Sequence, residues 1–305
     1  MWKYYAFRFS GATIAYLPRK LGYLTARFTA FMVYMLSPKT REAVADNMKR
    51  VLGPEADEVS LKPAVRDVLR NAAKNYYDLI RLPHMKLKDI ERLLTVHGWH
   101  NFEVALSKGK GVILVTAHLG SFDLAAQVFP SHSVKVTGLV EPLEPEVLLK
   151  HVVALRNSHG MNFMPVQFGV LKVVMRSLRS GEVVLIACDR DFGNDSMKLD
   201  FFGERTAMPA GAVRIAMKTG AALVPVFNLR QKDGLYDVYF EPEVEVLPEG
   251  DGAVANNMNR VIAVMEKYIK IYPEQWVVLN PVWQGSEAGE SVMPSALSVD
   301  RAVDL

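Results

Sequence analysis

The stretch Gly111–Asp123, GVILVTAHLGSFD, decides the fold. Its apolar run, Val112–Ala117, is short and rich in β-branched residues, which is typical of a buried strand. A helix is predicted directly after it, at Phe122–Phe129. A buried strand that leads into a helix is one repeating unit of an α/β fold.

His118 lies at the predicted mouth of this strand, and Asp123 follows five residues later. A carboxylate can fix the tautomer of a histidine ring and stabilise the imidazolium, while the other ring nitrogen takes a proton from a hydroxyl. The pair therefore indicates a transferase or hydrolase. The spacing itself is weak evidence, because His84 and Asp89 share it in a charged loop with no strand before it. A structural histidine is the alternative.

The spacing also restricts how His118 and Asp123 can meet. Residues five apart on a helix point about 140° away from each other, so contact requires His118 to lie in the turn before the helix. Gly120 relaxes that turn, and Ser121 is the expected N-cap. Asp123 would then lie in the first helical turn, where the helix dipole favours a negative charge.

Outward from this stretch, short apolar runs alternate with helical segments. Such alternation predicts a mostly parallel central sheet with helices on both faces. Residues 236–246 read as one longer strand, expected to be antiparallel. We expect an amphipathic helical extension over residues 1–60, one α/β domain over 61–284, and a disordered tail at 285–305. Strands are predicted at 112–117, 134–140, 183–188 and 222–229, and helices at 61–82, 101–108, 121–129, 145–158, 168–180, 209–219 and 253–271.

Composition narrows the class of protein further. Half of the 305 residues are hydrophobic and the formal net charge is +3, which suits an anionic membrane surface or an acidic substrate, although many other enzymes look alike. The lone cysteine, Cys188, excludes an intrachain disulfide and suits a reducing compartment. Aromatic side chains mixed with Lys and Arg over residues 1–36 predict an interfacial helix that contacts a membrane. The alternative is an amphipathic helix packed on the protein's own core.

Two further segments carry charged side chains that could form a site. Asp189, Arg190 and Asp191 follow the strand at 183–188, and open α/β sheets place their ligand crevice at the carboxyl ends of strands. Segment 201–211 contains Glu204 and Arg205 before a predicted helix, whose N-terminus could bind an anion. The alternative for residues 189–191 is a solvated loop. The alternative for segment 201–211 is the ordinary start of a helix.

The remaining charged residues and motifs give weaker evidence for a functional site. Glu141 and Arg156 are single charges at a strand end and within a helix, and such charges more often lie on the surface. No paired-histidine helix motif, second cysteine or phosphate-loop spacing is present in the sequence. We therefore predict neither a metal nor a nucleotide cofactor.

Taken in order, six segments resemble the bacterial branch of the lysophospholipid acyltransferase superfamily, over about residues 60–284. This branch contains the late acyltransferases of lipid A synthesis and the phosphatidylinositol mannoside acyltransferases. Asp123, where the lipid A enzymes typically carry Glu, and Arg190, where they carry Gln, tilt the resemblance toward the mannoside enzymes. The segments are His118-x4-Asp123, VEP at 140–142, LRNSHGMNFMP at 155–165, ACDRDFG at 187–193, DFFGERTAMPAG at 200–211 and YPEQWVVLNPVW at 272–283.

The resemblance implies direct acyl transfer from a thioester to a sugar hydroxyl, with His118 as the base and Asp123 orienting it. It implies acyl-CoA as donor in the mannoside branch and acyl carrier protein in the lipid A branch. The protein would dock as a peripheral protein on the cytoplasmic face of the inner membrane, without a cofactor. The implied substrate-binding residues are Glu141 and Arg156 for the acceptor head, Arg190 and Arg205 for phosphate, and Asp189, Asp191 and Glu204 from the same motifs.

Two other functions remain open at this point. A hydrolase could use the same His118 and Asp123 to activate water on a thioester or lipid ester. A non-catalytic lipid-binding protein would tolerate the loss of His118. The acceptor also stays open, since several glycolipids present a sugar hydroxyl near an anionic group.

Overall fold

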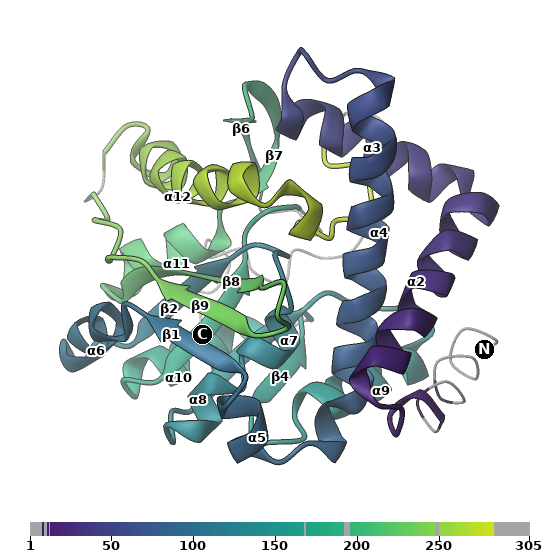
Figure 1. The fold of residues 1–305 in the computed structure, drawn as a ribbon. Helices are drawn as coiled ribbons and strands as arrows, with labels where there is room; N and C mark the ends of the chain where they lie inside the picture. The colour runs from purple at the N-terminus through teal and green to yellow at the C-terminus, as the bar shows by residue number, and fades with distance from the viewer. Residues whose placement is uncertain are drawn as a thin grey trace.

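The computed structural model describes residues 8, 11, 13–167, 169–191, 196–247 and 250–283, and it contains a seven-stranded sheet surrounded by helices (Figure 1). Neighbouring strands are parallel except at one junction, β8 with β9. This confirms the predicted α/β class. Across the sheet the strands are β1 (Leu94–His97), β9 (Tyr236–Phe240), β8 (Ala222–Arg230), β2 (Val112–Thr116), β5 (Val183–Ala187), β3 (Val136–Val140) and β4 (Asn162–Pro165).

Strand β2 lies in the middle of the sheet and is buried on both faces. Ile113 and Val115 contact one hydrophobic core, whereas Val112 and Leu114 contact the other, because successive strand residues point to opposite faces. The uninterrupted apolar run in the sequence therefore serves two cores. The first core includes residues of α10 (Val170–Arg179), α11 (Gly211–Thr219) and α12 (Ala253–Ile271), and the second includes residues of α6 (Trp99–Ser107), α8 (Val128–Ser131) and α9 (Glu146–Arg156).

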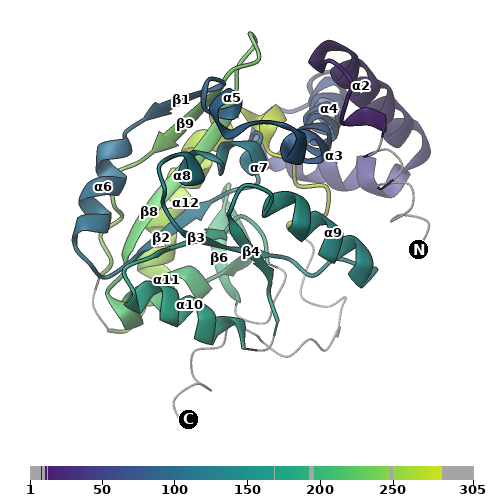
Figure 2. The ribbon, with the colours of Figure 1, turned by 90° about the horizontal axis from the view of Figure 1, so that it is seen from below.

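Three long N-terminal helices, α2 (Arg19–Leu36), α3 (Pro38–Leu52) and α4 (Glu58–Arg81), group together on one side of the molecule (Figures 1 and 2). Helix α4 confirms the helix predicted at 61–82. At Gly22 of α2, an added Cβ atom would lie 2.0 Å from the Tyr77 ring, so only glycine allows this close contact with α4. In the described part of the chain, none of the helices is long and apolar enough to span a bilayer.

The helix predicted after the His118 turn is shorter than expected. It is divided into α7 (Phe122–Ala125) and α8, and Ser121 makes no capping hydrogen bond to it. The Ser121 hydroxyl instead donates to Asp78 of α4, at 2.9 Å. A tertiary contact has therefore replaced the local cap.

The long strand predicted at 236–246 ends early, at Phe240. Pro242 has no N–H to donate to a strand partner, and beyond it only Val244 forms an isolated bridge, with Leu223. Its antiparallel pairing with β8 is as predicted, but β9 also pairs in parallel with β1, a strand that the sequence pattern did not reveal. The short elements η1 (Leu82–His84), α5 (Leu87–Glu91) and η2 (Pro273–Gln275) complete the connections.

The segment with Glu204 and Arg205 forms a hairpin rather than the approach to a helix. Strands β6 (Ser196–Phe201) and β7 (Glu204–Pro209) are joined by Phe202 and Gly203, with φ values of 52° and 78°. Positive φ at both turn residues matches the twist of a tight hairpin. Arg205 therefore belongs to β7 and not to the N-terminus of α11. The predicted tail at 285–305 lies outside the described residues.

Candidate active site

The sheet brings His118 and Asp189 together at its carboxyl edge. Strands β2 and β5 are parallel neighbours, with Thr116 opposite Ala187, and the Cys188 N–H donates to the Thr116 carbonyl at 2.8 Å. His118 and Asp189 each lie two residues beyond this last pair. Their contact is thus a consequence of strand order.

Asp189 is completely buried and holds His118 by two hydrogen bonds. Its Oδ1 lies 2.8 Å from the ring Nδ1, and its Oδ2 accepts from the His118 backbone N–H at 2.8 Å. The Trp276 indole N–H donates to the same Oδ2, also at 2.8 Å. Burial opposes ionisation, but the electrostatic interaction with the His118 ring and these hydrogen bonds outweigh it and lower the pKa of Asp189. Asp189 therefore stays a carboxylate at neutral pH.

This geometry leaves the other ring nitrogen of His118 available for chemistry. Within the described residues, Nε2 has no hydrogen-bond partner, and the side chain is 28% exposed. A carboxylate on Nδ1 places the ring proton there, so that Nε2 can accept a proton. The Phe122 ring stands edge-on to the imidazole, with centroids 5.4 Å apart, and limits its movement.

Asp123 does not serve as the partner of the His118 ring, which corrects the expected pairing. It lies in the first turn of α7, as predicted, but its Oδ1 is 2.6 Å from the Nε of Arg156 on α9. The ring nitrogen that Asp123 was expected to contact is already bound by Asp189. Residues 118 and 123 are close in sequence, yet the turn between them directs Asp123 toward α9.

The turn after His118 is tightly constrained. Gly120 has φ of +63°, and a Cβ atom there would lie 2.2 Å from the Asn228 carbonyl oxygen. The His118 carbonyl accepts from the Val277 N–H at 2.8 Å. Glycine is therefore required both for the backbone conformation and for the close approach of β8.

A cavity of about 340 Å³ opens beside His118 and combines charged and apolar side chains. Its volume is in the range of small-molecule sites. Arg190 forms an ion pair with Glu141, and both line the cavity together with Asp123 and Arg156. The mixed lining suits a molecule with a polar head and an apolar chain. The apolar wall consists of Leu79, Leu139, Leu143, Val152, Phe163, Leu185, Ile186, Val277 and Leu279, among others.

Four of the predicted substrate-binding residues do not line this cavity. Asp189 is buried under His118 and does not face the cavity. Asp191 follows Arg190 without lining the cavity. On the hairpin, Glu204 pairs with Arg50 at 2.7 Å, and the exposed Arg205 donates to the Lys198 carbonyl at 3.0 Å. The hairpin residues are thus engaged on the surface rather than in this cavity.

Sequence reasoning missed Trp276 as a functional candidate. Its side chain is completely buried and donates to the carboxylate under His118. The closing YPEQW segment contains this tryptophan, but the sequence does not indicate that its indole contacts Asp189. Cys188 is also completely buried, and burial raises the pKa of its thiol, which disfavours a nucleophilic thiolate.

The chain is similar in sequence to known bacterial acyltransferases. Residues 1–285 match the family model of bacterial lipid A biosynthesis acyltransferases. The chain is 30% identical over 249 residues to a phosphatidylinositol mannoside acyltransferase of Mycolicibacterium smegmatis, covering 79% of each chain. It is 29% identical to the Mycobacterium tuberculosis protein of the same name, over 79% of this chain and 77% of the relative. A lipid A biosynthesis palmitoleoyltransferase of Escherichia coli is 27% identical, over 66% of this chain and 65% of the relative.

Proposed function

The chain belongs to the family of bacterial lipid A biosynthesis acyltransferases, and from that premise we propose a more specific reaction. The protein transfers a long-chain fatty acyl group from acyl-CoA to a sugar hydroxyl of a glycolipid such as a phosphatidylinositol mannoside, with His118 as general base. The observation that carries this proposal is that His118, held by the buried Asp189, lies at the wall of a cavity with both charged and apolar sides. The mannoside acyltransferases match over a longer stretch, 79% of this chain against 66% for the palmitoleoyltransferase, and this supports the acceptor class.

The reaction follows from the orientation of His118. Nε2 takes the proton of the acceptor hydroxyl as its oxygen attacks the thioester carbonyl, and Asp189 stabilises the imidazolium that forms. A new C–O bond forms and the C–S bond breaks. The proton then passes from Nε2 to the leaving thiolate, which departs as the free thiol of CoA. No acyl group needs to be attached to the protein.

The cavity offers a place for each part of the acceptor. The ion pairs of Arg156 with Asp123 and of Arg190 with Glu141 provide charged groups for a sugar and its phosphate. The apolar wall provides a dry surface for a hydrocarbon chain, which would also keep water from competing for the thioester. Asp123 remains a predicted site residue in this scheme, because it lines the cavity and pairs with Arg156 there.

The test is transfer of palmitate from palmitoyl-CoA to a phosphatidylinositol mannoside and to a lipid A precursor, with the full chain. We expect product with the mannoside and none with the lipid A precursor. Product only with acyl carrier protein as donor, or only with the lipid A precursor, would instead support the lipid A type of reaction. Free CoA that accumulates at the same rate with or without acceptor would identify a hydrolase.

We also propose that α2 docks the protein on the cytoplasmic face of the inner membrane. Large apolar side chains on this helix are 50–64% exposed at successive turns: Leu21, Leu24, Phe28, Phe31 and Met35. Arg27 of α2 and Arg66 and Arg70 of α4 border the same surface, around an apolar cavity of about 670 Å³. An exposed apolar stripe edged by cations is what an anionic lipid surface binds.

Replacing an aromatic side chain of this face should weaken vesicle binding. We expect Phe28→Asp and Phe31→Asp each to lower partition onto vesicles of phosphatidylglycerol and phosphatidylcholine by about tenfold, since each loses roughly 1.5 kcal/mol of apolar transfer. Sedimentation with the vesicles measures this. Val104→Asp is the matched control, because Val104 is 60% exposed on α6, across the molecule from α2 (Figure 1). Equal binding by all three variants would contradict docking through α2.

A further inference from the structure

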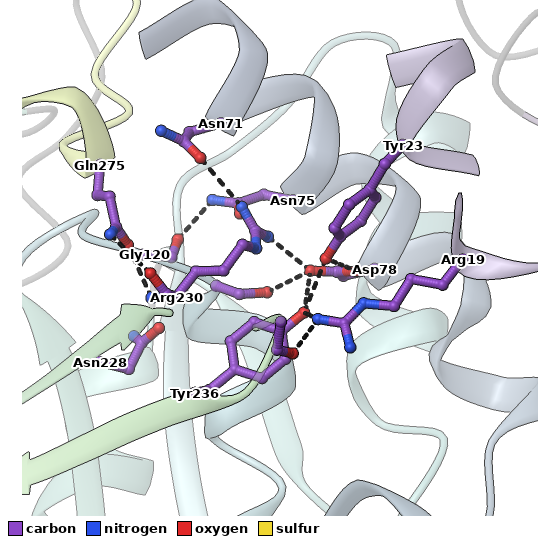
Figure 3. Close-up of polar contacts among 12 residues, drawn as sticks. Arg19, Tyr23, Asn71, Asn75, Asp78, Gly120, Asn228, Arg230, Tyr236 and Gln275 are labelled. Atoms are coloured by element: carbon purple, nitrogen blue, oxygen red, sulfur yellow. Dashed lines mark hydrogen bonds and ion pairs between the residues drawn. The ribbon is translucent and has the colours of Figure 1, made fainter. Parts of the chain in front are cut away.

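A buried polar cluster around Asp78 and Arg230 lies where α2, α4, β8 and β9 meet (Figure 3). Neither Asp78 nor Arg230 lines the cavity. Arg230 Nη2 lies 2.6 Å from Asp78 Oδ2, and each side chain is 5% exposed. A buried ion pair adds little net stability over a well-packed apolar pair, because both charges must leave water. Stability alone is therefore a weak explanation for the pair at this junction.

From α4, the cluster holds two residues of the turn that follows His118. Asp78 Oδ2 accepts from the Ser121 hydroxyl at 2.9 Å. Asn75, one helical turn earlier, accepts from Arg230 at 2.8 Å and donates to the Gly120 carbonyl at 2.5 Å. Without the side chains of Asn75 and Asp78, the turn would lose the hydrogen bonds that hold it from the side of α4.

From the other side, β8 and the segment after α12 hold the same turn. Asn228 donates to the Leu119 carbonyl at 3.0 Å, and the Gln275 carbonyl accepts from the Gly120 N–H at 2.9 Å. The Gln275 side chain also bonds both the N–H and the carbonyl of Arg230, at 2.8 and 2.9 Å. The backbone of Leu119 and Gly120 and the hydroxyl of Ser121 are therefore bound by elements that converge on the Asp78–Arg230 pair.

Helix α2 reaches the same pair from its inner face. The Tyr23 hydroxyl lies 3.3 Å from Asp78 Oδ1 and 3.0 Å from the Tyr236 hydroxyl, which itself donates to Asp78 Oδ2 at 2.9 Å. Arg19 donates to the Gly234 carbonyl and, at 3.3 Å, to the Tyr236 hydroxyl. Figure 3 shows Arg19 and Tyr23 directed at the cluster from α2. One helix thus carries the exposed apolar face and a direct contact to the pair that holds the His118 turn.

We propose that the Asp78–Arg230 cluster positions the His118 turn and couples its geometry to the docking of α2 on a lipid surface. Asp78 and Arg230 are positioning residues, since they act on His118 through Ser121 and Gly120. The inference rests on the proposed function, in which His118 is the base. A small displacement of the turn would move Nε2 relative to the acceptor hydroxyl, and misplacement by about 1 Å can lower a rate by roughly 100-fold.

Two variants test the coupling without leaving a buried charge unpaired. Ser121→Ala removes the hydrogen bond between the turn and Asp78, and Tyr23→Phe removes the hydroxyl by which α2 contacts Asp78. Tyr77→Phe is the matched control, because its hydroxyl bonds the Leu17 carbonyl next to α2, at 2.9 Å, without contacting Asp78. On the full chain we would measure deuterium exchange over residues 117–123, binding to vesicles of phosphatidylglycerol and phosphatidylcholine, and kcat and KM with and without those vesicles.

We expect Ser121→Ala to exchange faster over 117–123 and to lose roughly 10- to 100-fold in kcat with KM nearly unchanged. The coupling predicts that vesicles raise the kcat of the wild type. Tyr23→Phe should bind vesicles like the wild type but lose that increase. Tyr77→Phe should match the wild type in all measurements. A kcat loss that only followed a loss of folded protein, measured by thermal unfolding, would indicate a structural role and overturn the proposal.

The failure of this proposal is distinguishable from failure of the proposed function. Wild-type exchange and kcat in both Ser121→Ala and Tyr23→Phe would overturn the positioning role, even if His118 proves essential. Full activity of a His118→Ala variant would overturn the proposed base. The exchange measurement needs no substrate and would still show whether the cluster holds the turn.

Discussion

We expect His118→Ala to lower kcat for acyl transfer by about 10²–10⁴-fold, with KM for donor and acceptor changed only a few-fold. The substitution removes the base, Nε2, but leaves the cavity walls in place. The variant should still fold, because Asp189 keeps two of its donors, the backbone N–H of residue 118 and the Trp276 indole. Steady-state rates over a range of donor and acceptor concentrations give kcat and both KM values, and a thermal unfolding curve checks the fold.

His84→Ala is the control for this substitution. His84 and Asp89 have the same spacing as His118 and Asp123, but His84 packs on the Tyr16 ring and Asp89 pairs with Arg92. We expect this variant to retain activity within about twofold, as is usual for a surface substitution away from a site. Comparable losses in both variants would show that the activity does not depend on His118 as a base.

The second large effect is expected for Asp189→Asn, a loss on the order of 10³-fold in kcat. An amide cannot stabilise the imidazolium, and it can favour the wrong ring tautomer by donating to Nδ1. The backbone N–H of His118 and the Trp276 N–H would also lose a carboxylate acceptor. Histidine ¹⁵N resonances, which report the nitrogen that carries the proton, measure the tautomer independently of turnover.

Asp123→Asn provides the contrast, because its carboxylate contacts Arg156 rather than the ring. We expect this variant to keep the proton on Nδ1 of His118 and to raise KM for the acceptor, as Arg156 loses its partner in the cavity. Should Asp123→Asn alter the tautomer while Asp189→Asn preserves it, the assignment of Asp189 to the ring would be wrong.

Much of the architecture could be predicted from local patterns. The run at 112–117, the alternation of strands with helices and the helix at 253–271 all agree with the structure, since each depends on residues adjacent in the chain. Local reasoning failed where a distant contact decided the outcome. Ser121 bonds Asp78 instead of capping its helix, and residues 202–203 form a hairpin turn where a helix approach was predicted.

The sequence by itself determined the family, the α/β class and the position of His118 at the end of a buried strand, because motifs and periodicity are local. Only the tertiary structure decided which carboxylate holds the ring. Asp123 is near His118 along the chain, but Asp189 follows the strand that pairs with β2, and strand order depends on how both cores pack. The same holds for the Asp78–Arg230 pair, whose members lie 152 residues apart and meet only because α4 packs against the end of β8.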